Sequence, residues 1–230
     1  INGNNYSRTT NANGAASITI NLIAGNYNIS SFYAGTASYG SSSTSNFVKV
    51  LSTISGDDVE KYYRNDTQYY ATFVDGQGNL LNNTTVKFNI NGVFYERKTN
   101  ENGTAKLNIN LQSGDYILTA TNPVNGEMYS NDITVLTTVL ASDIVKYYKN
   151  DTQYYVTLLD NAGSPLINES ATFNINGMLY TRTTNDNGIA KMNINLNPDN
   201  YTITVTHPNG EMHSNNIEVL PTIFGNDLTM

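Results

Sequence analysis

The chain has 230 residues, of which only 13% are charged, and it carries a net charge of −7 and no cysteine. An acidic chain without a basic stripe excludes nucleic-acid binding, because nothing in it would neutralise phosphates, and an anionic membrane surface would repel it. The missing cysteines exclude disulfides, thiolate metal sites and cysteine nucleophiles, and no apolar run is long enough to predict membrane insertion.

The dominant feature of the sequence is an internal repeat. Residues 59–74 read VEKYYRNDTQYYATFV, and residues 144–159 read IVKYYKNDTQYYVTLL. Lys61 and Lys146 lie 85 positions apart (146 − 61), as do Gly103 and Gly188 (188 − 103). A constant offset over this length predicts structural units in tandem.

Partial copies flank the two complete ones. Residues 1–22 match 90–111, and residues 222–230 match 138–146. Two whole repeats between two partial ones indicate a longer array. The predicted domains are the C-terminal part of a repeat at 1–51, complete repeats at 52–136 and 137–221, and the first strand of a following repeat at 222–230.

Within each repeat, apolar and polar residues alternate with the period of a β-strand. Met192, Ile194 and Leu196 alternate with polar residues, and Ile203 and Val205 alternate with threonines. Such alternation is typical of antiparallel strands with one face on a core. About seven strands are predicted in the last complete repeat, at 139–148, 152–159, 170–175, 178–184, 189–196, 201–207 and 214–220.

Turn residues separate these strands at short intervals. Asn176–Gly177 between two apolar runs is a strong hairpin signal, because both residues tolerate a positive φ. Tyr116 and Tyr201 each follow a turn, where a sandwich often holds a tyrosine corner. Seven short strands with regular turns predict an all-β chain of tandem immunoglobulin-like antiparallel β-sandwich repeats.

The runs VKYYKNDTQYYVTLLDNAGSPL, FNINGMLYTRTTNDNGIAKMNINL, YTITV and SNNIEVLP carry a family resemblance. Together they resemble the Ig-like repeats of adhesin-like cell-surface proteins of methanogenic archaea, and they are similar to invasin-type stalk domains of bacterial adhesins. The resemblance covers essentially the whole chain. It implies an exported cell-surface protein built from stacked sandwich domains, and it names no ligand.

Catalysis is not expected. No nucleophile elbow, phosphate loop or zinc motif is present. The two histidines, His207 and His213, lie near the ends of one predicted hairpin, with Glu211 as the nearest further metal ligand. The preceding repeat has Asn122 and Tyr129 at the matching positions, so a function shared by the repeats cannot depend on the histidines.

Asparagine sequons are the most frequent chemical signal. Asn65 and Asn150 occupy the same repeat position in the sequence NDT, which favours a shared exposed loop. An Asn-rich chain also produces sequons by chance, so their use as glycosylation sites depends on the host. The full set is Asn5, Asn28, Asn65, Asn82, Asn83, Asn102, Asn150, Asn168 and Asn200.

Two further chemistries are candidates. An intramolecular isopeptide bond would join a lysine of the first strand to an asparagine of the last, as Lys61 to Asn131 and Lys146 to Asn215. The alternative is that these lysines occupy ordinary exposed strand positions. Calcium, the one candidate cofactor, would suit the oxygen-rich turns, although asparagine and aspartate favour turns for backbone reasons alone. The turn residues concerned are Asn11, Asn13, Asp160, Asn185 and Asn187.

Tyrosine pairs and a repeated arginine complete the candidates. Neighbours on a strand face opposite ways, so one tyrosine of each pair should pack inward and one should face out, where it could bind a sugar or a protein. The pairs are Tyr62–Tyr63, Tyr69–Tyr70, Tyr147–Tyr148 and Tyr154–Tyr155. The repeated arginines, Arg8, Arg97 and Arg182, are expected to pair with an acidic residue across the strands.

Three functions follow from these patterns. The leading interpretation is a structural stalk whose partners are the neighbouring repeats of the same chain. The first alternative is a binding module whose repeats contact glycans or surface proteins of another cell multivalently. The second is a filament subunit that donates a strand to the next chain. All three place the protein outside the cell, on its surface.

Overall fold

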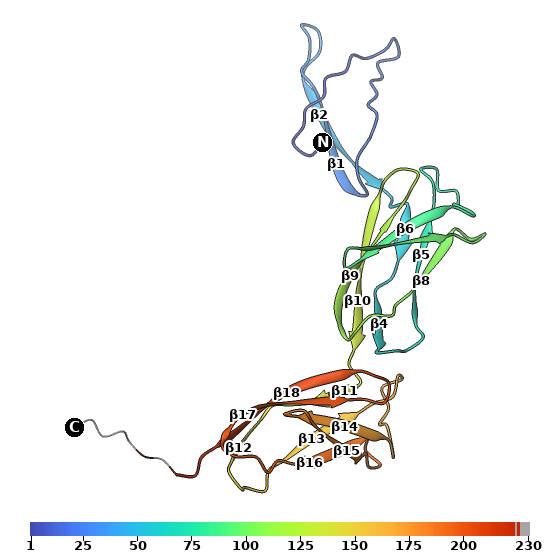
Figure 1. The fold of residues 1–230 in the computed structure, drawn as a ribbon. Coiled ribbons are helices and arrows are strands. Elements are labelled where there is room, and N and C mark those ends of the chain that lie inside the picture. Colours follow the sequence, from blue (N-terminus) through green and yellow to red (C-terminus); the bar gives the residue numbers. More distant parts are fainter. Residues whose placement is uncertain (224, 226–230) are drawn as a thin grey trace. The chain divides into compact units, whose positions relative to one another are not determined.

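The computed structural model describes residues 1–223 and 225, and none of these residues is helical (Figure 1). The predicted all-β class is confirmed. The segment 222–230, predicted as the first strand of a further repeat, lies mainly outside the described residues.

The first part of the chain forms a single hairpin. β1 (Gly25–Tyr33) pairs antiparallel with β2 (Ser42–Val50), with Tyr27 opposite Val48. Residues 4–22 contain no strand, and none of residues 1–53 is buried. The alternating runs of 1–22 find no sheet among the described residues that would cover their apolar face, which is why the predicted strand pattern is not realised there.

The first sandwich, β3–β10, has two sheets. One is five-stranded in the order β4-β10-β9-β6-β7, and the other is three-stranded in the order β3-β5-β8. Its strands are β3 (Ile54–Gly56), β4 (Val59–Tyr62), β5 (Gln68–Phe73), β6 (Thr85–Ile90), β7 (Val93–Lys98), β8 (Thr104–Asn108), β9 (Gly114–Thr121) and β10 (Met128–Leu136).

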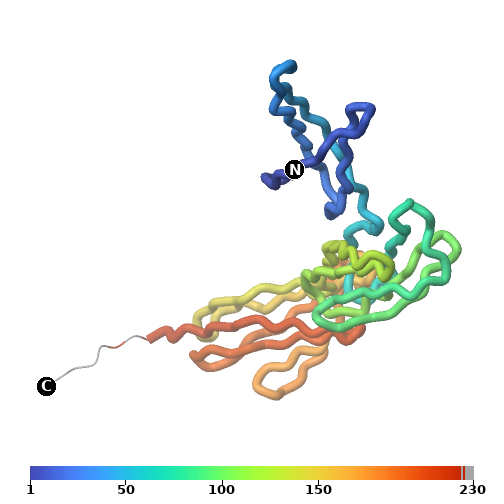
Figure 2. The backbone as a smooth tube through the Cα atoms, turned by 90° about the horizontal axis from the view of Figure 1, so that it is seen from above, coloured from blue at the N-terminus to red at the C-terminus, as the bar shows by residue number. Residues whose placement is uncertain are grey.

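The second sandwich, β11–β18, repeats this topology. Its sheets have the orders β12-β18-β17-β14-β15 and β11-β13-β16. Figure 2 shows it as long runs of chain joined by tight turns. Its strands are β11 (Val139–Ala141), β12 (Ile144–Tyr147), β13 (Gln153–Leu158), β14 (Ser170–Ile175), β15 (Met178–Thr183), β16 (Ile189–Asn193), β17 (Asp199–Thr206) and β18 (Met212–Leu220).

The described residues fall into two compact units whose limits differ from the predicted domains. One unit comprises Ile1–Asp57, Tyr70–Lys106 and Thr119–Ser130, and the other comprises the rest of the described chain. The domain limits read from the repeat period therefore stay predictions.

The predicted strand 139–148 is wrong in one respect, because it is two strands in different sheets. β11 pairs antiparallel with β13, whereas β12 pairs parallel with β18. Between them, the Asp143 carboxylate accepts hydrogen bonds from the backbone N–H of Asn216 (2.8 Å) and the side-chain amide of Asn215 (3.1 Å), which holds the chain against the last strand. Asp58 makes the same bonds to Asp132 and Asn131 in the first sandwich.

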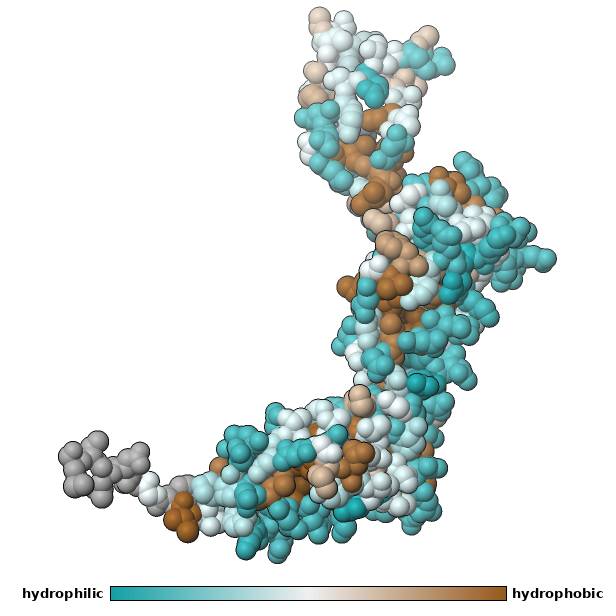
Figure 3. Space-filling model, in the orientation of Figure 1, coloured by the Kyte–Doolittle hydropathy of each residue, from teal (hydrophilic) through white to brown (hydrophobic). Residues whose placement is uncertain are grey.

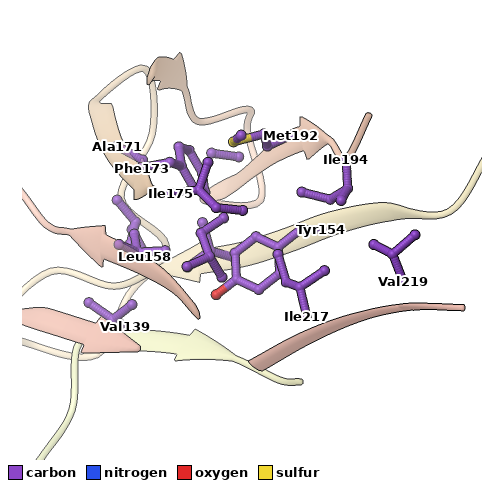
Figure 4. Close-up of a cluster of buried hydrophobic side chains, with 14 residues drawn as sticks. Val139, Tyr154, Leu158, Ala171, Phe173, Ile175, Met192, Ile194, Ile217 and Val219 are labelled. Carbon is purple, nitrogen blue, oxygen red and sulfur yellow. The ribbon is translucent and has the colours of Figure 1, made fainter. Parts of the chain in front are cut away.

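The core of the second sandwich fills the space between its two sheets (Figure 4). Tyr154 and Phe173 meet edge to face, with ring centroids 6.1 Å apart. The Tyr154 hydroxyl donates to Oδ1 of Asn215 (2.7 Å), so its polar end is satisfied inside the core. Burial of each large apolar side chain stabilises the fold by about 1.5–3 kcal/mol.

Candidate functional site

A buried lysine lies at the same place in both sandwiches. Lys146 projects inward from β12 and is 4% exposed. Its ammonium donates to the backbone carbonyls of Asn150 (2.7 Å), Thr152 (3.1 Å) and Ile194 (2.8 Å). One side chain therefore fastens the first strand, the loop after it and the end of β16 together.

Lys61 repeats this arrangement with fewer bonds. It is 5% exposed and donates to the carbonyls of Thr67 (3.3 Å) and Ile109 (2.9 Å). Burial lowers the pKa of the Lys61 ammonium, and the nearby Asp66 carboxylate offsets part of that shift. The ammonium thus loses hydration on burial and donates hydrogen bonds to backbone carbonyls in its place.

The structure corrects the reading of these lysines as exposed strand residues. The inward alternation of Ile144, Lys146 and Tyr148 is the signal that could have shown their burial, but a lysine at such a position is read as exposed by default.

The structure also does not bring the proposed isopeptide partners together. In the parallel pair of β4 and β10, Lys61 stands opposite Val135, four residues beyond Asn131, which is about 13 Å along a strand. The Asn131 side chain is instead engaged by Tyr69 and Asp58. In the second sandwich, Lys146 stands opposite Val219, and Asn215 binds Tyr154 and Asp143. The first and last strands are neighbours as expected, but the geometry gives the cross-link no support.

The NDT sequons form part of the loop that the lysine holds. Asn65 Oδ1 accepts bonds from the N–H (2.9 Å) and hydroxyl (2.6 Å) of Thr67, and Asn150 Oδ1 accepts one from the N–H of Thr152 (2.7 Å). Asn65 is half-buried. Glycosylation stays a prediction for all nine sequons, of which the exposed ones are Asn5, Asn28, Asn82, Asn83, Asn102, Asn150, Asn168 and Asn200.

A repeated glutamate ties the last hairpin to the start of the first strand, a role that the sequence pattern did not predict. In the first sandwich, Glu127 accepts bonds from the N–H (2.7 Å) and hydroxyl of Thr53. In the second, Glu211 accepts the same two bonds from Thr138. The run NGEM, repeated at 125–128 and 209–212, was the available signal.

These carboxylates are held ionised. Burial raises the pKa of Glu127, but the hydrogen bonds from the Thr53 hydroxyl and amide outweigh it, so the pKa lies below 4.5. The same balance of burial against the bonds from Thr138 lowers the pKa of Glu211. Each carboxylate therefore has a defined structural partner in the threonine. In Glu211 both bonds fall on Oε2, and within the described residues the buried Oε1 accepts no hydrogen bond.

His207 has a structural role as well. Its Nε2 donates to the carbonyl of Leu159 (2.9 Å), and its Nδ1 accepts the backbone N–H of Asn209 (2.9 Å). Burial lowers the pKa of the imidazole below 6.5. Both ring nitrogens are thus occupied in the neutral form, which leaves neither available to a metal.

In the first sandwich, Asn122 makes bonds that match those of His207. Its Nδ2 donates to the carbonyl of Val74 (2.9 Å), and its Oδ1 accepts the N–H of Val124 (3.0 Å). His213 lies on β18 opposite Val205 and takes no part in the hydrogen bonds of His207. No group of three or more His, Asp or Glu side chains that could hold a metal ion occurs among the described residues.

The oxygen-rich turns proposed for calcium use their oxygens internally. Asp160 Oδ1 accepts the N–H groups of Ala162 and Ser164, and Asn185 Oδ1 accepts those of Asn187 and Ile189. Asn11 bonds Asn13 in the same way. These Asx turns account for the residue types through the backbone, and calcium stays a prediction.

The predicted tyrosine geometry is confirmed for three of the four pairs, whereas in Tyr62–Tyr63 the outer ring, Tyr62, is half-buried instead of exposed. Tyr154 is fully buried and Tyr155 is 54% exposed, and Tyr69 and Tyr70 divide in the same way. The two tyrosine corners also form, since the hydroxyls donate to backbone carbonyls four residues upstream. These bonds join Tyr116 to Gln112 (2.9 Å) and Tyr201 to Asn197 (3.0 Å).

The expectation for the arginines is wrong. The guanidinium of Arg97 donates to the carbonyl of Glu96 (2.8 Å) and lies over the Tyr95 ring, 5.6 Å from its centroid. Arg182 and Arg8 also donate to the carbonyl of the preceding residue. The acidic side chain pairs with a lysine instead, as Lys87 with Glu96 at 3.8 Å. A guanidinium that reaches its own backbone and a neighbouring ring needs no carboxylate.

Comparison with known proteins finds likenesses to solved structures only. No family model matches the chain, and no curated protein matches it. Fibronectin(III)-like modules of Clostridium thermocellum CbhA are 15% identical, with 77% of this chain and 99% of that chain covered at a TM-score of 0.28. The Yersinia pseudotuberculosis adhesin InvE is 17% identical, with 73% and 58% covered at a TM-score of 0.31.

A further likeness is to the Bacteroides ovatus protein SGBP-B of a mixed-linkage glucan utilization locus, in complex with a mixed-linkage heptasaccharide. It is 14% identical, with 87% of this chain covered at a TM-score of 0.28, and this chain spans 54% of its length. The described residues contain no helix able to cross a membrane.

Proposed function

We propose that the chain is a stretch of the stalk of an extracellular adhesin, in which stacked sandwiches hold a binding region away from the cell. The observation that carries this proposal is the way each sandwich joins its own ends. The second segment of the split first strand runs parallel to the last strand in both sandwiches, β4 with β10 and β12 with β18. A pull on the two ends of a sandwich therefore loads this strand pair along its length.

Side-chain bonds hold the paired segments in place. The Asp143 carboxylate ties the start of β12 to β18, and the Lys146 ammonium ties β12 to the end of β16 in the other sheet. The first sandwich repeats both contacts with Asp58 and Lys61. Units that hold their own ends and differ little suit a spacer. The family resemblance of the repeats extends the proposal to a surface location, an archaeal source and a non-enzymatic role.

Cell display tests the stalk directly. The chain is placed between a surface anchor and a terminal epitope tag on yeast, and the capture of antibody-coated beads is measured under flow. Against a Gly/Ser linker with the same number of residues, the chain should increase capture, because a folded spacer keeps its length under load. Equal capture by the flexible linker would contradict the stalk.

A binding module is the second candidate, favoured by Tyr70 and Tyr155, which are equally exposed at one repeat position. Multivalent binding to glycans or to a surface polymer of another cell would appear in the same experiment as capture of untreated target cells by yeast that display the chain without the epitope tag.

Strand donation into a filament would appear as concentration-dependent growth in light scattering of the purified chain.

A further inference from the structure

The break in the first strand of the second sandwich leaves a surface hollow of about 520 Å³, which lies beside Tyr155. We call it the Tyr155 hollow. One wall consists of Leu140, Ala141 and Ile144, which flank the point where the chain crosses from one sheet to the other. The hollow lies at this crossing, where β11 and β12 belong to different sheets. Its volume lies in the usual range of small-ligand sites.

Tyr155 supplies a fixed aromatic surface at the hollow. Its side chain is 54% exposed, and its hydroxyl donates to Oε1 of Gln153 (2.9 Å). The Gln153 amide in turn donates to the side chain of Asn193. The ring is therefore held in place before any ligand arrives, which reduces the entropy lost on binding.

From these features we propose that the Tyr155 hollow binds a neutral sugar ring of a polysaccharide. The C–H face of a pyranose ring fits an aromatic ring beside an aliphatic wall, and its hydroxyls suit a few polar groups at the rim. Gln153, Ser142 and His213 provide those groups. Exposed hydrophobic residues of the chain are visible in Figure 3.

Charge decides the ligand class. None of the described residues that line the hollow is Asp, Glu, Lys or Arg. The nearby Asp143 carboxylate is already occupied by Asn215 and Asn216. A charged sugar would lose hydration in the hollow without gaining a residue of opposite charge. The net charge of −7 would also repel an anionic sugar. A neutral sugar has neither the desolvation penalty nor the repulsion.

An extended peptide fits the hollow less well. A peptide would add to the free edge of β11, which is only three residues long (Val139–Ala141). Strand addition draws its affinity from a row of main-chain hydrogen bonds, and so short an edge supplies few. The aromatic ring is the better developed feature of the site.

The first sandwich contains a matched control. Tyr70 corresponds to Tyr155 and is also 54% exposed, but Ser55 and Gly56 stand in place of Leu140 and Ala141. The same ring thus lacks the two apolar side chains. Binding is therefore expected at the second sandwich and not at the first.

The test uses the isotope-labelled whole chain, with cellohexaose, laminarihexaose and mannohexaose as neutral probes and hexagalacturonate as the charged comparison. At least one neutral hexaose should shift the amide signals of residues 139–144, 153–155 and 213. Tyr155→Ala should weaken this binding about tenfold or more, because it removes the central contact. Tyr70→Ala should leave it unchanged.

Further variants separate the site from general effects. Leu140→Ser, which installs the residue of the first sandwich, should also weaken binding, with unchanged amide signals in the core as evidence of folding. The proposal is overturned if no neutral hexaose shifts these signals at millimolar concentration, if hexagalacturonate binds more tightly, or if Tyr70→Ala weakens binding equally. It is likewise overturned if an apolar heptapeptide occupies the hollow and the sugars do not. The proposal is independent of the stalk function, which would stand in each of these cases.

Discussion

The first and second sandwiches share their internal bonds and differ in what they expose. Both hold a buried lysine, an inward tyrosine bonded to an asparagine of the last strand, and a glutamate on the threonine that precedes the first strand. Outward positions change freely, as where Ser55 is replaced by Leu140. The comparison shows that the repeat preserves these internal contacts, which we call the frame of the sandwich. New binding properties can arise on the surface without changing them.

Glycine substitution should give the largest effect and should separate the sandwiches from the N-terminal segment. At Gly188, φ is +71°, and an added Cβ would lie 2.6 Å from the carbonyl oxygen of Leu158. Gly188→Ala should therefore destabilise the second sandwich by about 3 kcal/mol, from left-handed backbone strain and a backbone clash together. Urea unfolding followed by resolved amide signals of each sandwich measures this.

Gly103→Ala should act alike on the first sandwich, since its Cβ would lie 2.7 Å from the carbonyl oxygen of Phe73. Gly14 has the same left-handed backbone but no atom within 4 Å of an added Cβ. Gly14→Ala should leave both sandwiches unchanged. A loss at Gly188 below about 1 kcal/mol would mean that the turn relaxes and is not packed as described.

Replacing the buried lysines should give the next largest effect, and it should be unequal. Lys146→Met removes the donor for three carbonyls and should cost about 2–3 kcal/mol, whereas Lys61→Met removes it for two and should cost about 1–2 kcal/mol. The free energy of unfolding of each sandwich in urea gives the comparison. The exposed Lys191 is the control, and Lys191→Met should change little.

Equal losses for the two lysines would show that the number of carbonyl bonds does not set their contribution. A gain in stability on replacement by Met would show that the cost of burying the ammonium exceeds its hydrogen bonds. Either result would remove the lysine from the set of contacts that reinforce the first strand.

Removal of the core hydroxyl should act equally on the two sandwiches. Tyr154 donates to Asn215 at 2.7 Å and Tyr69 to Asn131 at 2.8 Å. Tyr154→Phe and Tyr69→Phe should each cost about 1–1.5 kcal/mol, because an asparagine oxygen loses a buried donor. Differential scanning calorimetry of the two variants checks the match. A difference of more than about 1 kcal/mol between them would show that the two cores are not equivalent.

Much of this frame could be predicted from the sequence. The alternation that places Tyr154 inward and Tyr155 outward is a local property of a strand, so the sequence shows it. The tyrosine corner at Tyr201 also depends on one turn and one strand. Features that depend only on residues close together in the sequence can therefore be predicted from it.

Other features depend on partners distant in sequence. Lys146 is buried because the carbonyl of Ile194, 48 residues away, reaches it, and no local pattern contains that partner. The split of the predicted strand 139–148 depends in the same way on Asp143 meeting the last strand. The Tyr155 hollow lies at that split, so its place could be found only once the sheet order was known.

The smallest expected effect is a pH dependence that only the second sandwich should show. Burial lowers the pKa of His207 below 6.5, and the bonded carbonyl of Leu159 and the nearby Glu211 offset only part of the shift. The folded state therefore binds fewer protons than the unfolded state. The resulting stabilisation is fully present above pH 6.5 and is lost as the pH falls through the interval below it, by up to about 1 kcal/mol at pH 5.5.

The first sandwich provides the comparison, because Asn122 does not titrate and makes matching bonds. Its unfolding free energy should not change between pH 7 and pH 5.5. The glutamates at the matching positions of the two sandwiches, Glu127 and Glu211, have a pKa lowered from 4.5, so they become protonated only at lower pH. His207→Asn should make the second sandwich equally level. Urea unfolding at both pH values decides the matter. If the unfolding free energy of the second sandwich still depended on pH in His207→Asn, the dependence would come from another titratable group. The presence of His207 where the first sandwich has Asn122 would then have no effect on stability.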